Sequence, residues 1–412
     1  MGNKVLVIGS GGREHAIAKA FEQSSQVDTI YVVKGNPGFL IQLDKVELVN
    51  IEENDLTRLV EFAKVEEVAL TIVGSEINLS TGIVDAFRLA GLKIVGPTQA
   101  ASQLETSKTF AKEIMQEAHV KTASYKLFTN ETREEVEAYI SDLTMPIVIK
   151  QDGLASGKGV YIARTYDEAM QVLDELPHKK FLIEEFLEGP EFSHFSLVNG
   201  ESIIPLGMAR DYKCAYDNNE GPNTGGMGAF SPVTDHDEKL SEEIVEKVVK
   251  PVAKQMEENG TPFTGILYSG LIRVGTEFYV IEFNVRLGDP ETQILLPRIN
   301  EDFFDVLNAH LNQDDFTVTH KPGISLGVIL ASEGYPSEVK DNQPLTWTED
   351  TDFNKVIFAG VRQEHDVLYS KGGRVLMATA FENSVEACRE KVYESLAKIQ
   401  LTGGFFRKDI GL

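Results

Sequence analysis

The sequence predicts a protein of mixed α/β and α+β class that is divided into several domains and begins on a parallel β-sheet. Over the first hundred residues, short apolar runs alternate with amphipathic stretches, which is typical of a parallel sheet with helices on both faces. Further along the chain the strands lengthen and include a hairpin pattern, which is typical of α+β units. The chain has 412 residues, more than one hydrophobic core usually supports, so two to four packed units are expected.

Residues 1–100 form the first expected domain, an α/β unit. Each short apolar run is interpreted as a strand, and each longer amphipathic stretch as a helix. Gly96-Pro97-Thr98 interrupts the alternation and marks the first boundary. The expected strands are Lys4–Ile8, Thr29–Val33, Val68–Val73 and Lys93–Val95, and the expected helices are Arg13–Glu22, Leu56–Val65 and Leu79–Leu89.

Residues 101–190 form a second expected unit, of α+β class, with short loops. Ser102–Ala118 is expected as one long helix, and Pro146–Lys150 as a buried strand that precedes a glycine-rich loop. The other expected elements are the helices Arg133–Ile140 and Tyr166–Leu176 and the strands Ser124–Phe128, Val160–Ala163 and Lys180–Glu185.

Residues 191–322 and 323–412 form the last two expected units. In the first of them, Gly265–Val274 and Glu277–Val285 face each other across Gly275-Thr276, which suits a hairpin turn. The remaining expectations are a long loop at Asp211–Ser231, a helix at Asp235–Glu258, a strand at Ile324–Ser332 and a helix at Ser384–Ile399.

Charge and composition exclude some classes of partner. The formal charge of −25 counts against binding a nucleic-acid backbone, which needs a basic face, but not against small anions held by a few converging cations. No apolar run approaches the roughly 20 residues that cross a bilayer, so no membrane partner is expected. With Cys214 and Cys388 as the only cysteines, a disulfide framework is not expected, and the cytoplasm is the expected compartment.

A glycine turn, Gly9–Glu14, follows the first strand and opens a helix. Glycines let backbone N–H groups approach an anion at the positive end of that helix, and Arg13 can bind a phosphate through two bonds. Glu14 stands where the dinucleotide fingerprint needs its third glycine, which counts against a nicotinamide site. The alternative is a tight strand-to-helix turn without a ligand.

A second glycine-rich loop, Lys150–Val160, joins two expected strands. It is not a P-loop, because Asp152 stands where the first glycine is needed and Gly159 replaces the Ser/Thr. A loop of this kind that carries Lys158 suits a lid that folds over a triphosphate and excludes water. The alternative is a bare hairpin.

A polar strand supplies a candidate metal site. Alternation places Glu282 and Asn284 on one face, and a carboxylate beside an amide oxygen suits Mg²⁺ that is shared with phosphates. Arg286 extends this face toward a phosphoryl group in transit, and Asp289–Thr292 follows. The alternative is a polar face turned to water.

Two further segments favour ligand binding. Glu184–Glu191 ends a strand and looks like an interdomain hinge whose backbone reads an adenine edge; an acidic linker is the alternative. Gly221–Gly228 holds four glycines in eight residues, which indicates close backbone approach or movement, with simple flexibility as the alternative. His15 is expected to be a packing residue, and no Cys/His spacing suggests zinc.

In their order and spacing, these motifs resemble those of the glycinamide ribonucleotide synthetase family, which are ATP-grasp ligases of purine synthesis. The resemblance implies a pre-ATP-grasp domain (1–100), a two-part ATP-grasp domain with a lid (101–190) and a metal site (191–322), and a small C-terminal mixed domain (323–412). It covers essentially the whole chain, through Val7–Ala16, Gly35–Gly38, Ser107-Lys108, Lys150–Val160, Pro222–Gly228, Glu282–Thr292 and Phe405–Gly411.

The resemblance also implies a reaction. ATP would phosphorylate the carboxylate of glycine, and the amine of 5-phosphoribosylamine would attack the glycyl phosphate, so that positioning and charge neutralisation dominate catalysis. The implied partners are these small molecules, the implied cofactor is Mg²⁺ or Mn²⁺, and the implied state is a monomer or weak homodimer.

Residue by residue, the resemblance implies four groups of site residues. Catalysis would involve Arg286, Lys213 and Asp211, and metal binding Glu282 and Asn284. ATP would contact Lys108, Lys150, Gly153, Ser156, Gly157, Lys158, Gly159, Glu184, Glu185, Phe186, Leu187 and Glu191. The other substrates would contact Gly11, Gly12, Arg13, Glu14, Asn36, Pro37, Gly38, Asn223, Thr224, Gly225 and Gly226.

The sequence departs from the family pattern in three places. Ser75, Ile77 and Asn78 replace the Pro-Glu-Ala-Pro pattern around Glu76, and Cys214 stands where arginine is usual. The strand Gly265–Val274 lacks the acidic metal ligand of related enzymes. The alternatives to the implied activity are an ATP-grasp ligase or carboxylase with a different acceptor, a Rossmann oxidoreductase, and a non-catalytic nucleotide-binding regulator.

Overall fold

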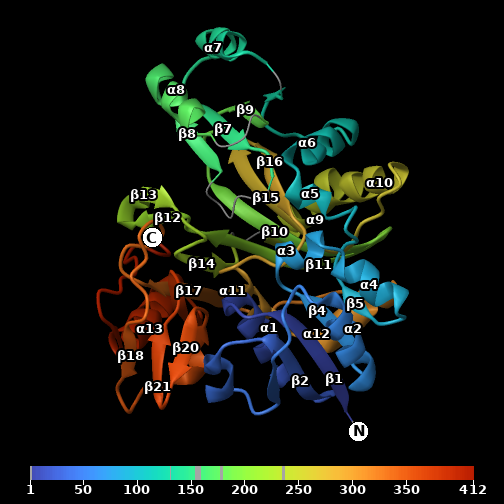
Figure 1. Ribbon diagram of the computed structural model, residues 1–412, viewed down its shortest axis with the longest axis vertical. Coiled ribbons are helices and arrows are strands. Elements are labelled where there is room, and N and C mark those ends of the chain that lie inside the picture. Colours follow the sequence, from blue (N-terminus) through green and yellow to red (C-terminus); the bar gives the residue numbers. More distant parts are fainter. Residues whose placement is uncertain (1, 130, 154–158, 177–179, 234–236) are drawn as a thin grey trace.

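The computed structural model describes residues 2–129, 131–153, 159–176, 180–233 and 237–412. In Figure 1 the N-terminal region (blue) and the C-terminal region (red) lie together at one end of an elongated molecule, and a small sheet of four strands lies at the other. An eight-stranded sheet, in the order β16-β15-β10-β11-β14-β17-β22-β19, connects the two ends.

The N-terminal region is the predicted α/β unit, with a five-stranded parallel sheet in the order β3-β2-β1-β4-β5. Alternate residues of β1 enter different cores, because successive side chains of a strand point to opposite faces: Val5 and Val7 pack in one, Leu6 and Ile8 in the other. The elements are β1 Asn3–Gly9, α1 Gly12–Glu22, β2 Val27–Lys34, the 3₁₀ helix Pro37–Ile41, β3 Val46–Val49, α2 Leu56–Val65, β4 Leu70–Val73, α3 Glu76–Ser80, α4 Ile83–Leu89 and β5 Ile94–Val95.

Two of the expected helices are broken, so these predictions were wrong in detail. Instead of Leu79–Leu89, α3 and α4 are separated at Gly82, which has a φ of 85° that glycine adopts at little cost. Instead of Ser102–Ala118, α5 (Gln103–Thr106) ends at Ser107, whose hydroxyl accepts a hydrogen bond from Phe110 N at 3.2 Å and caps α6 (Lys108–Glu117). Apolar spacing continues across both breaks, and therefore hides them from a pattern-based prediction.

The second unit has a small antiparallel sheet in the order β6-β9-β7-β8 and a separate hydrophobic core. Helices α7 and α8 pack against each other and contribute to that core. The elements are β6 Tyr125–Phe128, α7 Arg133–Ser141, β7 Ile147–Gln151, β8 Val160–Ala163, α8 Tyr166–Glu175 and β9 Phe181–Glu185.

The third unit supplies most of the eight-stranded sheet. The hairpin β15–β16 turns at Gly275-Thr276 as predicted. The prediction of a loop over Asp211–Ser231 was wrong, because this segment contains β12, β13 and β14. Strand β14 pairs with β11 and β17, and the local sequence does not reveal these partners. The elements are β10 Glu191–Asn199, β11 Ser202–Asp211, β12 Cys214–Tyr216, β13 Glu220–Asn223, β14 Gly228–Ser231, α9 Asp237–Ile244, a π-helical turn Val245–Val249, α10 Lys250–Glu258, β15 Thr264–Val274, β16 Glu277–Asn284, α11 Thr292–Leu295 and α12 Phe303–Asn312.

The C-terminal region continues the same sheet instead of starting a new one. Strand β14 pairs with β17, and β17 with β22, so main-chain hydrogen bonds cross the expected boundary at residue 322. The division into four domains therefore stays a prediction. The elements are β17 Ile324–Ala331, β18 Pro344–Trp347, β19 Val356–Phe358, β20 Val361–Glu364, β21 Val367–Ser370, β22 Arg374–Glu382, α13 Val385–Ala397 and β23 Ile399–Leu401.

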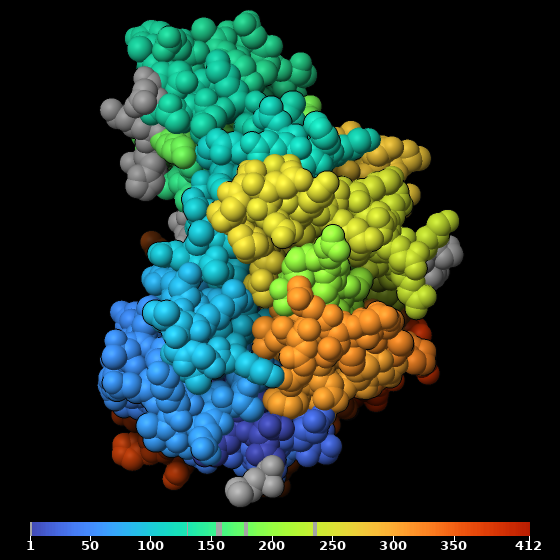
Figure 2. Space-filling model, turned by 90° about the vertical axis from the view of Figure 1, so that its right-hand side faces the viewer, coloured from blue at the N-terminus to red at the C-terminus, as the bar shows by residue number. Residues whose placement is uncertain are grey.

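Helix packing holds the second unit onto the third. Figure 2 shows the yellow surface of α10 directly against the teal surface of the second unit, and α6 is the helix that contacts α10. Within the described ranges, no helix is both long enough and apolar enough to cross a membrane.

Candidate functional site

A cavity of about 470 Å³ lies between the small sheet of the second unit and the strands β15 and β16. Its walls come from all regions of the chain, including the first turn of α1 and the start of β22. The predicted site residues that line it are Arg13, Lys108, Lys150, Gly153, Gly159, Glu184, Glu185, Phe186, Leu187, Glu191, Asp211, Lys213, Asn223, Thr224, Gly225, Glu282, Asn284 and Arg286.

Lysines dominate one end of the cavity, which we call the lysine end and define by Lys108, Lys112, Lys150 and the segment 184–187. Glu184, on β9, lies between two of these cations: its Oε2 is 2.8 Å from Lys150 Nζ and its Oε1 is 3.1 Å from Lys112 Nζ. Burial lowers the pKa of Lys112 to about 8, against the opposing charge of Glu184. Glu184 therefore holds both ammonium groups in fixed positions at this end.

The break between α5 and α6 positions Lys108. Its backbone N–H donates to Asp152 Oδ1 at 2.7 Å, and its Nζ donates to Gly153 O at 2.9 Å. Burial lowers the pKa of Lys108, and Glu282 opposes this shift. The helix start and the beginning of the glycine-rich loop are thus bonded to each other. Ser156, Gly157 and Lys158 of that loop lie outside the described residues.

A β-bulge shapes the strand that carries the expected metal ligands. Gly270 pairs with Glu282 and Leu271 pairs with Val280, which leaves Ile281 as an extra residue. Its carbonyl accepts a hydrogen bond from Lys150 Nζ at 3.2 Å. Beyond the bulge, Glu282 and Asn284 both line the cavity, as the alternation predicted.

Arg286 follows on the same strand face and is held by acids. Its Nη2 is 2.9 Å from Glu105 Oε1 and donates to Asn284 Oδ1 at 3.1 Å, while its Nε is 3.4 Å from Glu76 Oε2. Burial works against the charged form, but the charges of Glu105 and Glu76 raise the pKa of Arg286 above its usual value. The guanidinium is therefore charged and fixed in direction.

A group of charged residues on β10, at and after the end of β11, and just before α11 lines the cavity together with Tyr268 of β15. Lys213 Nζ is 2.8 Å from Glu191 Oε2, and although burial lowers the pKa of Lys213, the charges of Asp211 and Glu191 raise it well above the usual value. Tyr268 donates its hydroxyl to Glu291 Oε1 at 2.9 Å. Burial and the charge of Asp211 raise the pKa of Glu291 to about 7.

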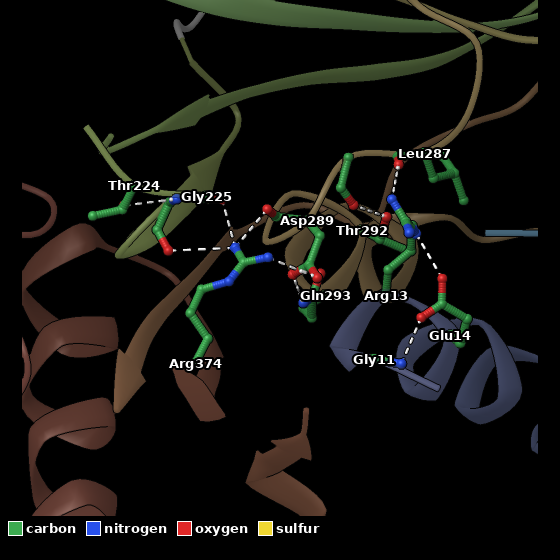
Figure 3. A network of polar contacts seen from close by, with 12 residues as sticks. Gly11, Arg13, Glu14, Thr224, Gly225, Leu287, Asp289, Thr292, Gln293 and Arg374 are labelled. Atoms are coloured by element: carbon green, nitrogen blue, oxygen red, sulfur yellow. Dashed lines mark hydrogen bonds and ion pairs between the residues drawn. The ribbon is translucent and has the colours of Figure 1, made fainter. Parts of the chain in front are cut away.

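The Gly9–Glu14 segment, which leads from β1 into α1, lines the cavity only through Arg13. Arg13 Nε is 2.7 Å from Glu14 Oε1 and its Nη1 donates to Leu287 O at 3.2 Å, as Figure 3 shows. Glu14 is buried and accepts from Gly11 N at 2.7 Å. Asn36 donates to Ser10 O at 2.8 Å, and this hydrogen bond stabilises the turn. The predicted residues that do not line the cavity are Gly11, Gly12, Glu14, Asn36, Pro37, Gly38 and Gly226.

His15 packs below this turn, as predicted. Its Nδ1 accepts a hydrogen bond from Phe358 N at 3.0 Å, and its ring stacks on Phe39. Burial lowers its pKa to about 3, so the ring is neutral.

The Gly221–Gly228 segment contributes Asn223, Thr224 and Gly225 to the cavity wall. Thr224 Oγ1 donates to Lys213 O at 2.7 Å and accepts from Gly226 N at 2.9 Å. The tip of this segment is therefore folded back on β12 and is not an open connector.

Several cavity residues were missed by sequence reasoning. Lys112 follows Lys108 by one helical turn, a spacing that places two residues on one helix face and was available as a signal. Asp289 and Glu291 lie in the Glu282–Thr292 motif, but the sequence pattern did not indicate a function for them. The other missed polar residues, which no local pattern singles out, are Glu76, Glu105, Tyr268 and Arg374.

Arginines dominate the other end of the cavity, which we call the arginine end and define by Arg13, Arg286, Arg374, Asp289 and residues 223–225. Strand β16 extends from one end of the cavity to the other. The charge of its Glu282 opposes the burial that lowers the pKa of Lys108 at the lysine end, and its Asn284 accepts a hydrogen bond from Arg286 at the arginine end. One cavity thus offers cations at both ends and an acid–amide pair between them. Within the described ranges, no three His, Cys, Asp or Glu residues gather as a metal cluster.

Comparisons with known proteins agree with this architecture. The family models of phosphoribosylglycinamide synthetase match as the N domain over residues 3–105, the ATP-grasp (A) domain over 106–292 and the C domain over 325–412. A phosphoribosylamine–glycine ligase of Streptococcus pyogenes serotype M3 is 45% identical over 419 residues, covering 99% of this chain and 98% of the relative. The ligase of that name in Listeria monocytogenes serotype 4b is 44% identical, with 99% of both chains covered.

Solved structures give the same result. The crystal structure of the phosphoribosylamine–glycine ligase of Thermotoga maritima matches with a TM-score of 0.84 and 30% identity, over 99% of this chain and 100% of that chain. A biotin carboxylase of Campylobacter jejuni matches with a TM-score of 0.72 and 15% identity over 100% and 94%, which shows a shared fold alone. The resemblance inferred from the motifs is confirmed, and the chain belongs to the phosphoribosylglycinamide synthetase family, with an ATP-grasp domain at its centre.

Proposed function

We propose that this chain catalyses the ATP-dependent ligation of glycine to 5-phosphoribosylamine, giving glycinamide ribonucleotide, ADP and phosphate. Membership of the family and its full-length relatives support this activity. The structural observation that carries it is the single cavity with a lysine end, an arginine end and the acid–amide pair of β16 between them. Such a cavity can hold a nucleotide triphosphate and a second anionic substrate on the two sides of one transferring group.

The lysine end is the proposed nucleotide site. Lys108 and Lys150 would contact the phosphates, the backbone of 184–187 the adenine edge and Glu191 the ribose hydroxyls. The Lys150–Val160 loop, including Lys158, would close above them and exclude water. The burial of Lys150 beside Glu184 supports this assignment, because the lysine is held in place before any phosphate arrives.

The donor set of β16 fits a hard divalent cation. Mg²⁺ is commonly bound through one or two protein oxygens together with substrate phosphates, and Glu282 and Asn284 offer a carboxylate and an amide oxygen on one face. We propose that these two residues hold Mg²⁺ or Mn²⁺. When bound, the ion would neutralise charge on the phosphates.

The proposed reaction has two steps, and the residues that line the cavity would position the reacting groups for each of them. A carboxylate oxygen of glycine attacks the γ-phosphorus, the bond to the ADP oxygen breaks, and glycyl phosphate forms; Arg286 would stabilise the charge of the transferring group. The amine of phosphoribosylamine next attacks the acyl carbon, phosphate leaves and the nitrogen loses a proton. Lys213 and Asp211 present one cation and one acid, which match the two charged groups of glycine.

The test is a measurement of ADP release with glycine and freshly prepared phosphoribosylamine, each omitted in turn. We expect rapid ADP release only when both are present, together with formation of the amide product. Equal release with neither substrate would refute the ligase. Bicarbonate-dependent ADP release would instead point to a carboxylase.

A further inference from the structure

We propose that Arg374 is a positioning residue that fixes the tip of the Gly221–Gly228 segment over the arginine end of the cavity and so keeps water from the acyl phosphate. This inference rests on the proposed function, since it concerns the second half of that reaction. Arg374 begins β22 in the C-terminal region, and neither composition nor motif spacing singled it out.

The contacts of Arg374 connect two loops. Its Nη1 donates to Gly225 O at 2.5 Å and to Asp289 O at 2.7 Å, with Gly226 O at 3.4 Å. Its Nη2 is 3.0 Å from Asp289 Oδ2. Figure 3 shows the guanidinium between the glycine segment on one side and Asp289 on the other. One side chain thus ties the glycine segment to the loop that follows β16.

Asp289 is itself fixed, so the connection is rigid. Gln293 Nε2, on α11, donates to Asp289 Oδ1 at 2.7 Å. Burial favours the neutral carboxyl, but the charges of Arg374 and Arg13 hold the pKa of Asp289 below its usual value. A charged carboxylate between two arginines and an amide donor has little freedom to move.

The glycine segment depends on such outside support. Gly226 has a φ of 109°, and a Cβ there would lie 2.5 Å from Pro290 Cδ, so the backbone packs directly on the loop that Arg374 binds. Glycines leave a chain with many accessible conformations. Besides Arg374, the tip is held by the bond from Gly225 N to Tyr335 Oη at 2.9 Å, by the bond from Gly226 N to Thr224, and by the bonds that Thr224 donates to Lys213 O.

The same geometry argues against Arg374 as a direct ligand of substrate phosphate. Both of its Nη atoms are already engaged by protein oxygens, three of them main-chain carbonyls and one a charged carboxylate. Releasing them to bind a phosphate would leave Asp289 without its closest cation. Arg374 therefore acts through the segment that it holds.

The consequence concerns the fate of glycyl phosphate. If the tip opens, water can attack the acyl carbon; the bond from that carbon to the phosphate oxygen breaks, a proton is released, and glycine and phosphate form. The net result is hydrolysis of ATP to ADP and phosphate without product. Exclusion of water by a fixed loop is a common way to prevent this loss.

The experiment compares wild type with Arg374→Ala and Arg374→Lys in three quantities: KM for phosphoribosylamine, KM for ATP, and ADP formed per product. For the alanine variant we expect KM for phosphoribosylamine to rise about 10-fold, because charged hydrogen bonds are lost. KM for ATP should stay within about twofold, and ADP per product should rise from about one to above about two. The lysine variant should recover part of both effects, since one ammonium can replace the charge but not the planar fork.

Two further variants make the outcome decisive. Arg362→Ala, in the same region but away from the cavity, should match wild type in all three quantities. Asp289→Asn should raise ADP per product like Arg374→Ala, and the double variant should add little, as expected for one shared contact. An unchanged ratio of ADP to product in folded Arg374→Ala, or an equal rise in both KM values, would overturn the proposal. Absence of product with wild type would instead overturn the proposed function.

Discussion

The two ends of the cavity are built differently. The lysine end is formed by Lys108, Lys112, Lys150 and Glu184, which come from one unit of the chain and lie within a span of 77 residues, counted from 108 to 184. At the arginine end, Arg13, Arg286 and Arg374 come from the N-terminal, central and C-terminal regions. The residues of the first end come from α6 and the small sheet of one unit, whereas the second end needs all regions of the chain to be assembled.

The chemistry of the two cations fits this difference. Lysine is a point charge on a flexible stem, so it can adjust to the position of a phosphate group. Arginine is a planar fork that binds carboxylates in fixed directions, and each of the three has an acidic partner, in Glu14, Glu105 and Asp289 respectively. The comparison therefore predicts that changes at the lysine end affect ATP, and that changes at the arginine end affect the acceptor.

The largest loss of turnover is expected from a change on β16, between the two ends of the cavity. Glu282→Gln should reduce turnover by more than about 100-fold, because the neutral amide is a poorer ligand for a divalent cation. Near-UV circular dichroism should show an unchanged fold. The matched control is Glu277→Gln, an exposed position on the same strand that pairs with Lys121 and does not line the cavity. Full activity in Glu282→Gln would move the metal site elsewhere.

A change at the lysine end should affect the KM values of the two substrates differently. Lys150→Ala should raise KM for ATP by about 30-fold while KM for phosphoribosylamine changes by less than about threefold, since the lost charge lies beside the proposed phosphates. Steady-state kinetics with each substrate varied provide the measurement. Lys126→Ala, an exposed lysine on β6 of the same unit, is the control. Equal changes in both KM values would break the proposed division of the cavity.

Acid should weaken the protein through the buried histidine behind the arginine end. Burial lowers the pKa of His15 to about 3, whereas the unfolded chain takes up a proton near pH 6.5, so acid favours the unfolded state. The stabilisation is complete above about pH 6.5 and is lost as pH falls toward 3, at roughly 1.4 kcal/mol per pH unit.

Comparison with a variant isolates this contribution. Between pH 7 and pH 5, wild type should lose about 2 kcal/mol more unfolding free energy than His15→Gln does. Urea unfolding at the two pH values provides the measurement, and His365→Asn, at an exposed position, should lose as much as wild type. An identical loss in His15→Gln and wild type would contradict the assignment.

The smallest effect is expected from a single neutral hydrogen bond at the arginine end. Tyr335→Phe removes the acceptor of Gly225 N, which donates at 2.9 Å. We expect a rise of about fivefold in KM for phosphoribosylamine, since one such bond contributes about 1 kcal/mol. Kinetics with ATP varied should show no change, and a larger effect on ATP than on the acceptor would contradict the comparison.

Much of the lysine end was predictable because its residues follow one another in recognisable local patterns. Lys150 and Glu184 each lie one residue before the end of a strand that the sequence predicted, and alternation along β16 placed Glu282 and Asn284 on one face. The bulge at Ile281 escaped prediction, because it depends on the register with β15. Lys112 could have been found from its position one helical turn after Lys108.

By itself, the sequence determined most of the element types, the parallel sheet at the start, and the glycine segments and polar strand of the proposed site. These follow from short-range rules: hydrophobic periodicity, the conformational freedom of glycine, and alternation along a strand. Only the tertiary structure decided which arginines share one cavity, which acid each one binds, and that β14 joins β11 to β17. The physical reason is that, apart from the neighbours Arg13 and Glu14, these contacts join segments tens to hundreds of residues apart. Their meeting depends on the packing of the whole chain and leaves no local pattern.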